Sequence, residues 1–384
     1  MWFEKAAYMF DVILALTISF AVSFLAIPVI IRVAALKKLY DLPDERKVHQ
    51  APIPALGGLG IFAGFCFAAL LIANFQQSRD IQYFLAASVV IFYLGLKDDI
   101  IVISPIKKFI GQVLAAFIII YYGNLQINSM HGFLGIYELP ETFSLLFTYL
   151  TVIVIINSFN LIDGIDGLAG SLGLLSTSVF GIYFVSIGNT TDAVLAFSLA
   201  GAILAFLIFN FQPARIFMGD TGSLLLGLIN AILVIKFINV AGHPGVSFPI
   251  SAAPAVGFGI LMVPLLDTLR VFAIRMFQRR SPFSPDRNHI HHLFLDHGFS
   301  HRTIAILLLT LNAIAIAICF MMRNSGCTWL MGLLFGIFYA VIGVMYYNRR
   351  RRPRLFVTPV DQVAKTKSTT KFVPLTEDSV LQQK

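Results

Sequence analysis

The chain has 384 residues, of which 58% are hydrophobic and only 12% are charged, and its mean hydropathy is +0.82. Since a soluble domain carries about 25% charged residues, this composition excludes an ordinary soluble protein and predicts a polytopic membrane protein. Lys and Arg exceed Asp and Glu by 28 to 20, which gives a net charge of +8. Two of the three cysteines (Cys66, Cys319 and Cys327) lie in apolar stretches, so neither a disulfide framework nor a thiolate metal site is indicated.

Apolar segments long enough to cross about 30 Å of hydrocarbon recur along the chain. We expect them to form an all-α transmembrane domain over residues 1–347, followed by a basic, disordered cytoplasmic tail at 348–384. The first segment is too long for a signal-peptide core, so we expect a retained helix. The eleven segments lie near 11–33, 56–74, 81–96, 108–123, 142–160, 168–188, 192–210, 222–240, 250–274, 303–322 and 329–347.

The distribution of Lys and Arg predicts the orientation. With eleven spans, the segments on the same side as the C-terminal tail carry 24 of the 28 basic residues. The positive-inside rule therefore places the C-terminus in the cytoplasm and the N-terminus outside.

The polar chemistry is concentrated in the five loops of the predicted cytoplasmic side. In the third loop, NSFNLIDGIDG, two aspartates and two asparagines directly follow an apolar span, where carboxylates are costly unless they serve a function. Its glycines indicate a bent backbone that polar groups can approach closely. The other loops carry DERKVHQAPIPALGG, the pair Asp98 and Asp99 with Lys107 and Lys108, NFQPARIFMGDTGS, and SPFSPDRNHIHH.

Each loop alone has an ordinary explanation as well. Adjacent aspartates after a helix are often a solvated helix end, and GDTGS can be a turn that caps the next helix. The HxHH run is compatible with a transition-metal site, because imidazole is a common ligand of such metals. Arginines surround the run, and they favour phosphate over a metal ion.

Taken together, the loops predict a phosphoryl-transfer site. Five aspartates in one place would repel one another unless a cation offsets the charge. Oxygen ligands favour a hard cation, Mg²⁺ or Mn²⁺, and the basic groups would then hold phosphates. At a bilayer surface, a lipid phosphate and a soluble nucleotide diphosphate are the expected substrates, and nucleic acid is not expected.

The five motifs, in this order, resemble those of the polyprenyl-phosphate N-acetylhexosamine-1-phosphate transferases over residues 35–302. SPFSPDRNHIHHL is most similar to the WecA/TagO-like branch. The resemblance implies Mg²⁺-dependent or Mn²⁺-dependent transfer of GlcNAc-1-phosphate from UDP-GlcNAc to undecaprenyl phosphate, releasing UMP. It also implies about eleven helices in the bacterial inner membrane, an active site facing the cytoplasm, and a product that initiates a cell-envelope glycan such as O-antigen in lipopolysaccharide. A homodimer stays open.

The resemblance also implies residue roles. Metal ligands would be Asp220 and Asn160, and catalytic groups would be Asp98, Asp99, Asp163, Asp166 and His291. Phe217 would stack on uracil, and the remaining substrate contacts would be Lys47, His49, Asn157, Asn210, Arg215, Arg287, His289 and His292. Positions 100–103 read IIVI where relatives often carry charge, so lipid-phosphate contacts there would fall to Lys107 and Lys108.

Several alternatives remain open. An ion-coupled transporter would also carry intramembrane acids, although we find no internal repeat and the acids cluster at one face. Another UDP-N-acetylhexosamine or UDP-MurNAc-pentapeptide could be the donor, and attack could be direct or pass through a covalent intermediate. We expect the histidine loop to lie outside the packed helices, with a short helix starting near Leu293, so that His291→Ala loses transfer but still folds.

Overall fold

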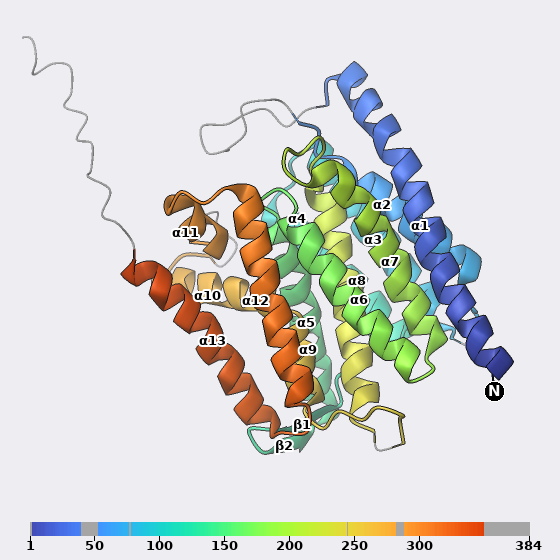
Figure 1. Cartoon of the computed structure of the whole chain (residues 1–384), viewed down its shortest axis with the longest axis vertical. Coiled ribbons are helices and arrows are strands. Elements are labelled where there is room, and N and C mark those ends of the chain that lie inside the picture. The colour runs from blue at the N-terminus through green and yellow to red at the C-terminus, as the bar shows by residue number, and fades with distance from the viewer. Residues whose placement is uncertain (1, 40–52, 77, 244, 282–287, 349–384) are drawn as a thin grey trace, which may run out of the picture. The chain divides into compact units, whose positions relative to one another are not determined.

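The computed structural model describes residues 2–39, 53–76, 78–243, 245–281 and 288–348, with side chains described from Tyr8 onward. Within these ranges the chain is mostly helical, which confirms the all-α prediction (Figure 1). A two-stranded antiparallel hairpin joins η1 to α5. The elements are α1 (Trp2–Lys37), α2 (Gly57–Ile72), α3 (Asp80–Ile100), α4 (Pro105–Phe117), η1 (Ile118–Tyr122), β1 (Ser129–Phe133), β2 (Ile136–Glu138), α5 (Glu141–Ile162), α6 (Leu168–Ser186), α7 (Thr190–Asn210), α8 (Gly219–Ala241), α9 (Ala253–Ile260), α10 (Met262–Phe277), α11 (Ile290–Asp296), α12 (His301–Met321) and α13 (Cys327–Tyr347).

Each of the eleven predicted apolar segments falls on a helix. In the described residues, nine helical segments are long and apolar enough to cross a membrane, and α2 is apolar but has only 16 residues. The segment predicted at 250–274 is broken, because α9 and α10 meet at an angle of 86°. The number of crossings, their orientation and the division at residue 347 stay predictions.

Helix α8 lies at the centre of the helical unit. It packs against α2, α3, α5, α6, α7 and α9, and its side chains are buried nearly all round from Thr221 to Ile238. A helix that is apolar on every face is stable only in such a position. Close packing depends on small residues: a Cβ at Gly227 would lie 2.6 Å from the Cα of Ile156 in α5.

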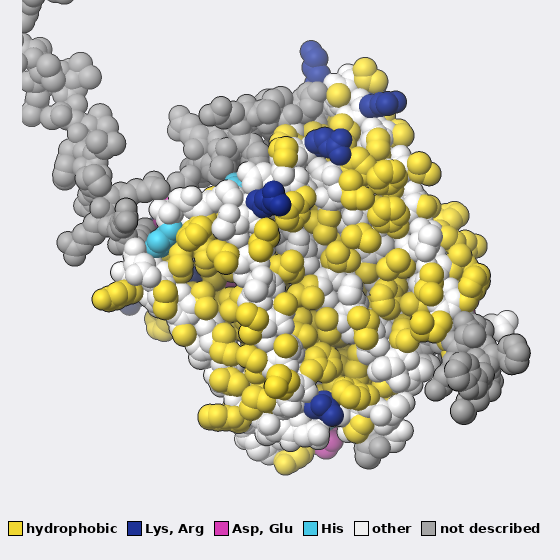
Figure 2. All heavy atoms as spheres, in the orientation of Figure 1, with side chains coloured by type: hydrophobic (Ala, Val, Ile, Leu, Met, Phe, Trp, Pro, Cys, Tyr) yellow, Lys and Arg dark blue, Asp and Glu magenta, His cyan; other side chains and the backbone are white. Residues whose placement is uncertain are grey.

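Apolar side chains also cover much of the surface of the unit. Figure 2 shows them over most of the visible face, with basic side chains gathered mainly towards one end. Large exposed apolar residues occur on most of the long helices, for example Leu25 in α1 and Leu146 in α5. Exposure of so much apolar surface to water would be unfavourable and would promote aggregation, so this surface suits contact with lipid tails.

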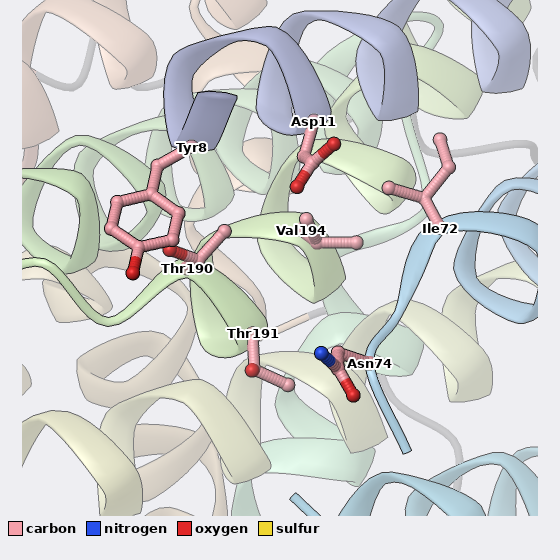
Figure 3. Close-up of a pocket in the computed structure, with 7 residues that line it drawn as sticks. All are labelled: Tyr8, Asp11, Ile72, Asn74, Thr190, Thr191 and Val194. Carbon is pink, nitrogen blue, oxygen red and sulfur yellow. The ribbon is translucent and has the colours of Figure 1, made fainter. Parts of the chain in front are cut away.

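Polar groups also meet at the opposite end of the helices from the five loops. Lys236 of α8 bonds the carboxylate of Asp80 and lies 3.8 Å from Oδ1 of Asp192, which explains a lysine inside an apolar span. Nearby, a cavity of about 80 Å³ lies between α1, the end of α2 and the start of α7, lined by residues such as Asp11 and Thr191 (Figure 3). Since α7 has 21 residues, this end is about 30 Å from the loop after α7.

Candidate active site

The five polar loops come together at one end of the helical unit. The backbone N–H of Phe217 donates to the carbonyl of Pro54, and the N–H of Gly58 donates to the carbonyl of Met218, so the first loop pairs with the fourth. The backbone N–H of Arg302 donates to the side chain of Gln212, which joins the fifth loop to the fourth. The second and third loops join through the side chains described next.

Asp99 caps the N-terminus of α8. Its carboxylate accepts hydrogen bonds from the backbone N–H groups of Asp220 (2.6 Å) and Thr221 (3.0 Å) and from the Thr221 hydroxyl (2.5 Å). Negative charge at a helix N-terminus satisfies free N–H groups and is favoured by the helix dipole. The contact requires Gly219, at φ +70°, because a Cβ there would lie 2.3 Å from the carbonyl of Ala55 and 2.8 Å from both Asp99 carboxylate oxygens.

Three oxygen atoms from different loops surround the Lys108 ammonium group. Its Nζ lies 2.5 Å from Oδ2 of Asp220, 3.2 Å from Oδ2 of Asp98 and 3.3 Å from Oδ1 of Asn160. The other Asp98 oxygen accepts the backbone N–H of Ile103 at 2.7 Å. The lysine therefore offsets the charge of two carboxylates that would otherwise repel each other.

This donor set fits the predicted hard cation. Asp220 and Asn160 face each other, with Nδ2 of Asn160 2.5 Å from Oδ1 of Asp220. Their remaining oxygens converge on the Lys108 cation, so the position already favours positive charge. No three His, Cys, Asp or Glu side chains in the described ranges are arranged to hold a metal ion. Mg²⁺ usually takes only one or two carboxylates and completes its shell with water and phosphate.

Two of the predicted asparagines have their amides engaged within the protein. Asn157 pairs with Gln112 of α4, with Nδ2 2.8 Å from Oε1. Asn210 accepts the backbone N–H of Gly167 and donates to the carbonyl of Ile216, both at 2.9 Å. Asn210 thus joins the third and fourth loops, and Asn157 joins α5 to α4.

The third loop places Asp163 and Asp166 differently. Asp163 is half-buried, and burial together with the charges of Asp220, Asp99 and Asp166 raises its pKa to about 8. Asp166 is buried, and its Oδ1 lies 3.3 Å from Nδ1 of His301 at the start of α12. The carboxyl of Asp163 therefore interacts electrostatically with Asp99 and Asp220, whereas Asp166 connects the third loop to α12 through His301.

Asp267 of α10 anchors the histidine loop. Its Oδ2 lies 2.8 Å from Nδ1 of His289, and its Oδ1 accepts the backbone N–H of Ile290 at 2.8 Å. Asp267 also forms an ion pair with Arg270, whose Nη2 lies 3.1 Å from Oδ1. The short helix also exists, but it begins at Ile290, because the carbonyl of the anchored His289 accepts the backbone N–H groups of His292 and Leu293 and so forms the first turn.

The expectation that this loop lies outside the packed helices is wrong. The side chain of His291 is only 2% exposed, and its ring stacks on His289 with centroids 5.6 Å apart. A Cβ at position 164 would lie 2.6 Å from Nε2 of His291, so Gly164 lets the ring approach the third loop. Burial and the neighbouring His292 lower the pKa of His291 to about 3, although Asp267 opposes the shift. His291 is therefore neutral at pH 7.

The remaining predicted residues are less enclosed. Arg215 is exposed and lies over the ring of Phe209 at 4.9 Å. Phe217 is half-buried beside the first loop, and His292 is half-buried with its ring 4.4 Å from that of His291. Lys47, His49 and Arg287 lie outside the described residues.

Two residues near the site, Asp267 and His301, were not among the predicted site residues, and Lys108 was predicted only as a contact of the lipid phosphate. Lys108 carried a signal, since it follows an acidic pair and begins an apolar helix, whereas its neighbour Lys107 is exposed. The sequence around Asp267 and His301 gave no indication that they contact the site, because their partners, His289 and Asp166, lie 22 and 135 positions away.

Comparison with known proteins decides the family. The description Glycosyl transferase family 4 matches residues 81–238. The undecaprenyl-phosphate alpha-N-acetylglucosaminyl 1-phosphate transferase of Escherichia coli O157:H7 is 31% identical over 291 residues, which are 74% of this chain and 77% of that protein. The chain belongs to this family.

Other members agree over similar lengths. The protein of the same description from Yersinia pestis is 32% identical over 304 residues, covering 78% of this chain and 80% of the relative. A decaprenyl-phosphate N-acetylglucosaminephosphotransferase from Mycobacterium leprae (strain TN) is 33% identical over 316 residues, covering 75% and 79%. These matches confirm the resemblance seen in the loops, and this family 4 member is a multi-pass membrane transferase.

Proposed function

We propose that this family 4 transferase moves GlcNAc-1-phosphate from UDP-GlcNAc to undecaprenyl phosphate and releases UMP. The observation that carries the proposal is the convergence of Asp98, Asp220 and Asn160 on Lys108. Carboxylates and a lysine in one place suit a substrate that carries several phosphate charges. The names of the relatives supply the donor sugar and the lipid.

The chemistry exchanges one phosphoanhydride for another. An oxygen of the lipid phosphate attacks the phosphorus next to the sugar, the bond from that phosphorus to the bridging oxygen breaks, and UMP leaves with that oxygen. Because one such bond forms as one breaks, positioning and charge stabilisation are the main tasks of the protein.

We propose Mg²⁺ or Mn²⁺ as the cofactor, held by Asp220 and Asn160. When bound, the cation would neutralise phosphate charge. Lys108 would then turn from Asp220 towards a phosphate oxygen. Asp98 lies within reach of the same ammonium group and would orient it, while Asp99 would keep α8 and Asp220 in place.

Neutral His291 would accept or donate a single hydrogen bond at the sugar diphosphate, and the half-buried Phe217 offers a ring for the uracil. Asp163, with its raised pKa, would join the charge network when the cation binds. We place the site at the cytoplasmic face of the bacterial inner membrane, where the product would begin a cell-envelope glycan such as O-antigen.

The donor should be the smaller sugar nucleotide. The ring of His291 lies directly against the backbone at Gly164, so the histidine loop and the third loop are in contact where a bulky lactyl-peptide would need room. We therefore expect UDP-GlcNAc to be used and UDP-MurNAc-pentapeptide to be ignored.

The test uses purified protein in detergent with undecaprenyl phosphate and Mg²⁺. Radiolabelled UDP-GlcNAc should give an extractable labelled lipid and an equal amount of UMP, and His291→Ala should reduce both. Preferential use of the pentapeptide donor would overturn the donor assignment and leave phosphosugar transfer in place. No labelled lipid from either donor would contradict the proposed reaction.

A further inference from the structure

A single side chain holds the break between α9 and α10. Asn312, in the middle of α12, donates from Nδ2 to the carbonyl of Ile260 at 2.9 Å and accepts the backbone N–H of Val263 at its Oδ1 at 3.0 Å. Ile260 is the last residue of α9 and Val263 is the second residue of α10. Asn312 is 1% exposed, so it is committed to the two sides of the break.

A break of 86° within an apolar region leaves backbone groups without helical partners. In such surroundings no water is present to bond them, so each needs a protein partner. Asparagine suits the position because its amide offers both a donor and an acceptor. Pro264 follows and has no N–H to satisfy. A leucine of similar size would fill the space but satisfy neither group.

Helix α10 transmits the geometry of the break to the histidine loop. Asp267 lies four residues after Val263 and therefore on the same face of the helix. It bonds His289 and the backbone of Ile290, and the adjacent His291 lies against Gly164. A change in the direction of α10 would move Asp267, and the histidine loop with it.

The same helix fixes a second point at the site. His301, about three turns before Asn312 in α12, contacts Asp166 of the third loop. Helix α12 thus touches the third loop at one position and the break at another. Because α12 contacts both, it can fix the position of the histidine loop relative to the third loop, which it meets at His291 and Gly164.

We propose that Asn312 is a positioning residue for transfer: by bonding both sides of the break, it sets the direction of α10 and so places the histidine loop against the third loop. Its effect on turnover rests on the proposed function, whereas its effect on the direction of α10 does not. A purely structural role would lower stability without moving α10.

The kinetic test compares Asn312→Leu with Asn230→Leu. Asn230 is an equally buried asparagine of α8 (0% exposed), and its hydrogen bonds go to its own helix and to Ser176 of α6. Both variants lose two buried hydrogen bonds. We expect kcat to fall by about 100-fold only in Asn312→Leu, the loss that a misplacement of about 1 Å can cause. The KM for UDP-GlcNAc should stay within about threefold.

The structural test measures the distance between nitroxide labels on Leu36→Cys in α1 and Phe277→Cys at the end of α10. Both positions are exposed, and the three native cysteines are replaced by alanine. A single narrow distance population is expected for the parent and for Asn230→Leu, and a shifted or broadened one for Asn312→Leu. This measurement needs no substrate, so it remains informative if the parent transfers no GlcNAc-1-phosphate.

A second variant covers the case in which Asn312→Leu does not fold. Asn312→Asp has the same shape, and a buried carboxyl tends to keep its proton and can then replace both bonds. We expect both the kcat and the label-to-label distance distribution of Asn312→Asp to lie between those of the parent and those of Asn312→Leu. An unchanged distance distribution in Asn312→Leu overturns the proposal, as does an equal fall in kcat for Asn230→Leu. If only Asn312→Asp folds, a distribution that still equals that of the parent when the pH is raised to ionise the carboxyl, which removes the donor to Ile260, overturns it as well.

Discussion

The ammonium group of Lys108 lies 2.5 Å from Oδ2 of Asp220, although the two residues are 112 positions apart in the chain. The contact joins α4 to the first turn of α8 and leaves positive charge at the point where phosphates would be held. Lys107, the adjacent residue, points to the exposed side of α4. The two lysines therefore form a matched pair for mutation.

We expect Lys108→Gln to lower kcat/KM for undecaprenyl phosphate by about 100-fold, because removal of one charge-stabilising donor has effects of this size. Lys107→Gln should stay within about twofold of the parent. Initial rates at varied lipid phosphate and saturating UDP-GlcNAc provide the measurement. Equal losses in the two variants would show that general surface charge, rather than the contact with Asp220, is responsible.

Asp220→Asn should weaken cation binding by at least about tenfold and lower turnover by several factors of ten, each worth about 1.4 kcal/mol. The change keeps the size of the side chain next to Asn160 but removes the charge. Free Mn²⁺ measured by electron paramagnetic resonance gives the affinity without an activity assay. Asp11→Asn, in the cavity of Figure 3, is the control and should bind Mn²⁺ like the parent; unchanged binding in Asp220→Asn would remove Asp220 from the cation site.

His291 should make the protein less stable in acid. Its folded pKa is about 3 against an ordinary value of 6.5, so between these values the unfolded chain binds a proton that the folded protein excludes. Its stabilising contribution is complete above pH 6.5 and is lost as the pH falls towards 3. The melting temperature of the parent should therefore fall between pH 6.5 and 4.5 more steeply than that of His291→Gln. The exposed His243→Gln should follow the parent, and parallel curves for all three proteins would contradict burial of a neutral His291.

The orientation can be tested with cysteines on exposed positions at the two ends. Tyr137→Cys in β2 replaces a residue that is 67% exposed, and Phe277→Cys replaces one that is 91% exposed. Asn189 is less suitable because its side chain caps α7 by accepting the N–H of Asp192. In intact cells without native cysteines, an impermeant maleimide should label Tyr137→Cys only. Labelling of Phe277→Cys alone would reverse the predicted topology.

Local patterns in the sequence were sufficient for the helices and for the general kind of site. A helix that crosses lipid must satisfy its own backbone bonds over a length set by the bilayer, so each apolar run identifies a helix without reference to the others. Acidic and basic motifs at one end of those runs indicated phosphoryl transfer for a similar reason, since charges at a membrane require a partner or a function. Asp98, Asp163 and Asp220 were identified in this way.

The tertiary structure alone decided how those residues are used. Four contacts of this kind join residues that are distant in the chain. They are the cap of α8 by Asp99, the bonds of Lys108, the bond of Asp267 to His289, and the bonds of Asn312 to both sides of the break. None of these partners is set by the hydropathy or spacing of its own segment. The prediction that His291 lies outside the packed helices was wrong for the same reason. A polar loop is buried only when another part of the protein, here Asp267 of α10, supplies its hydrogen bonds.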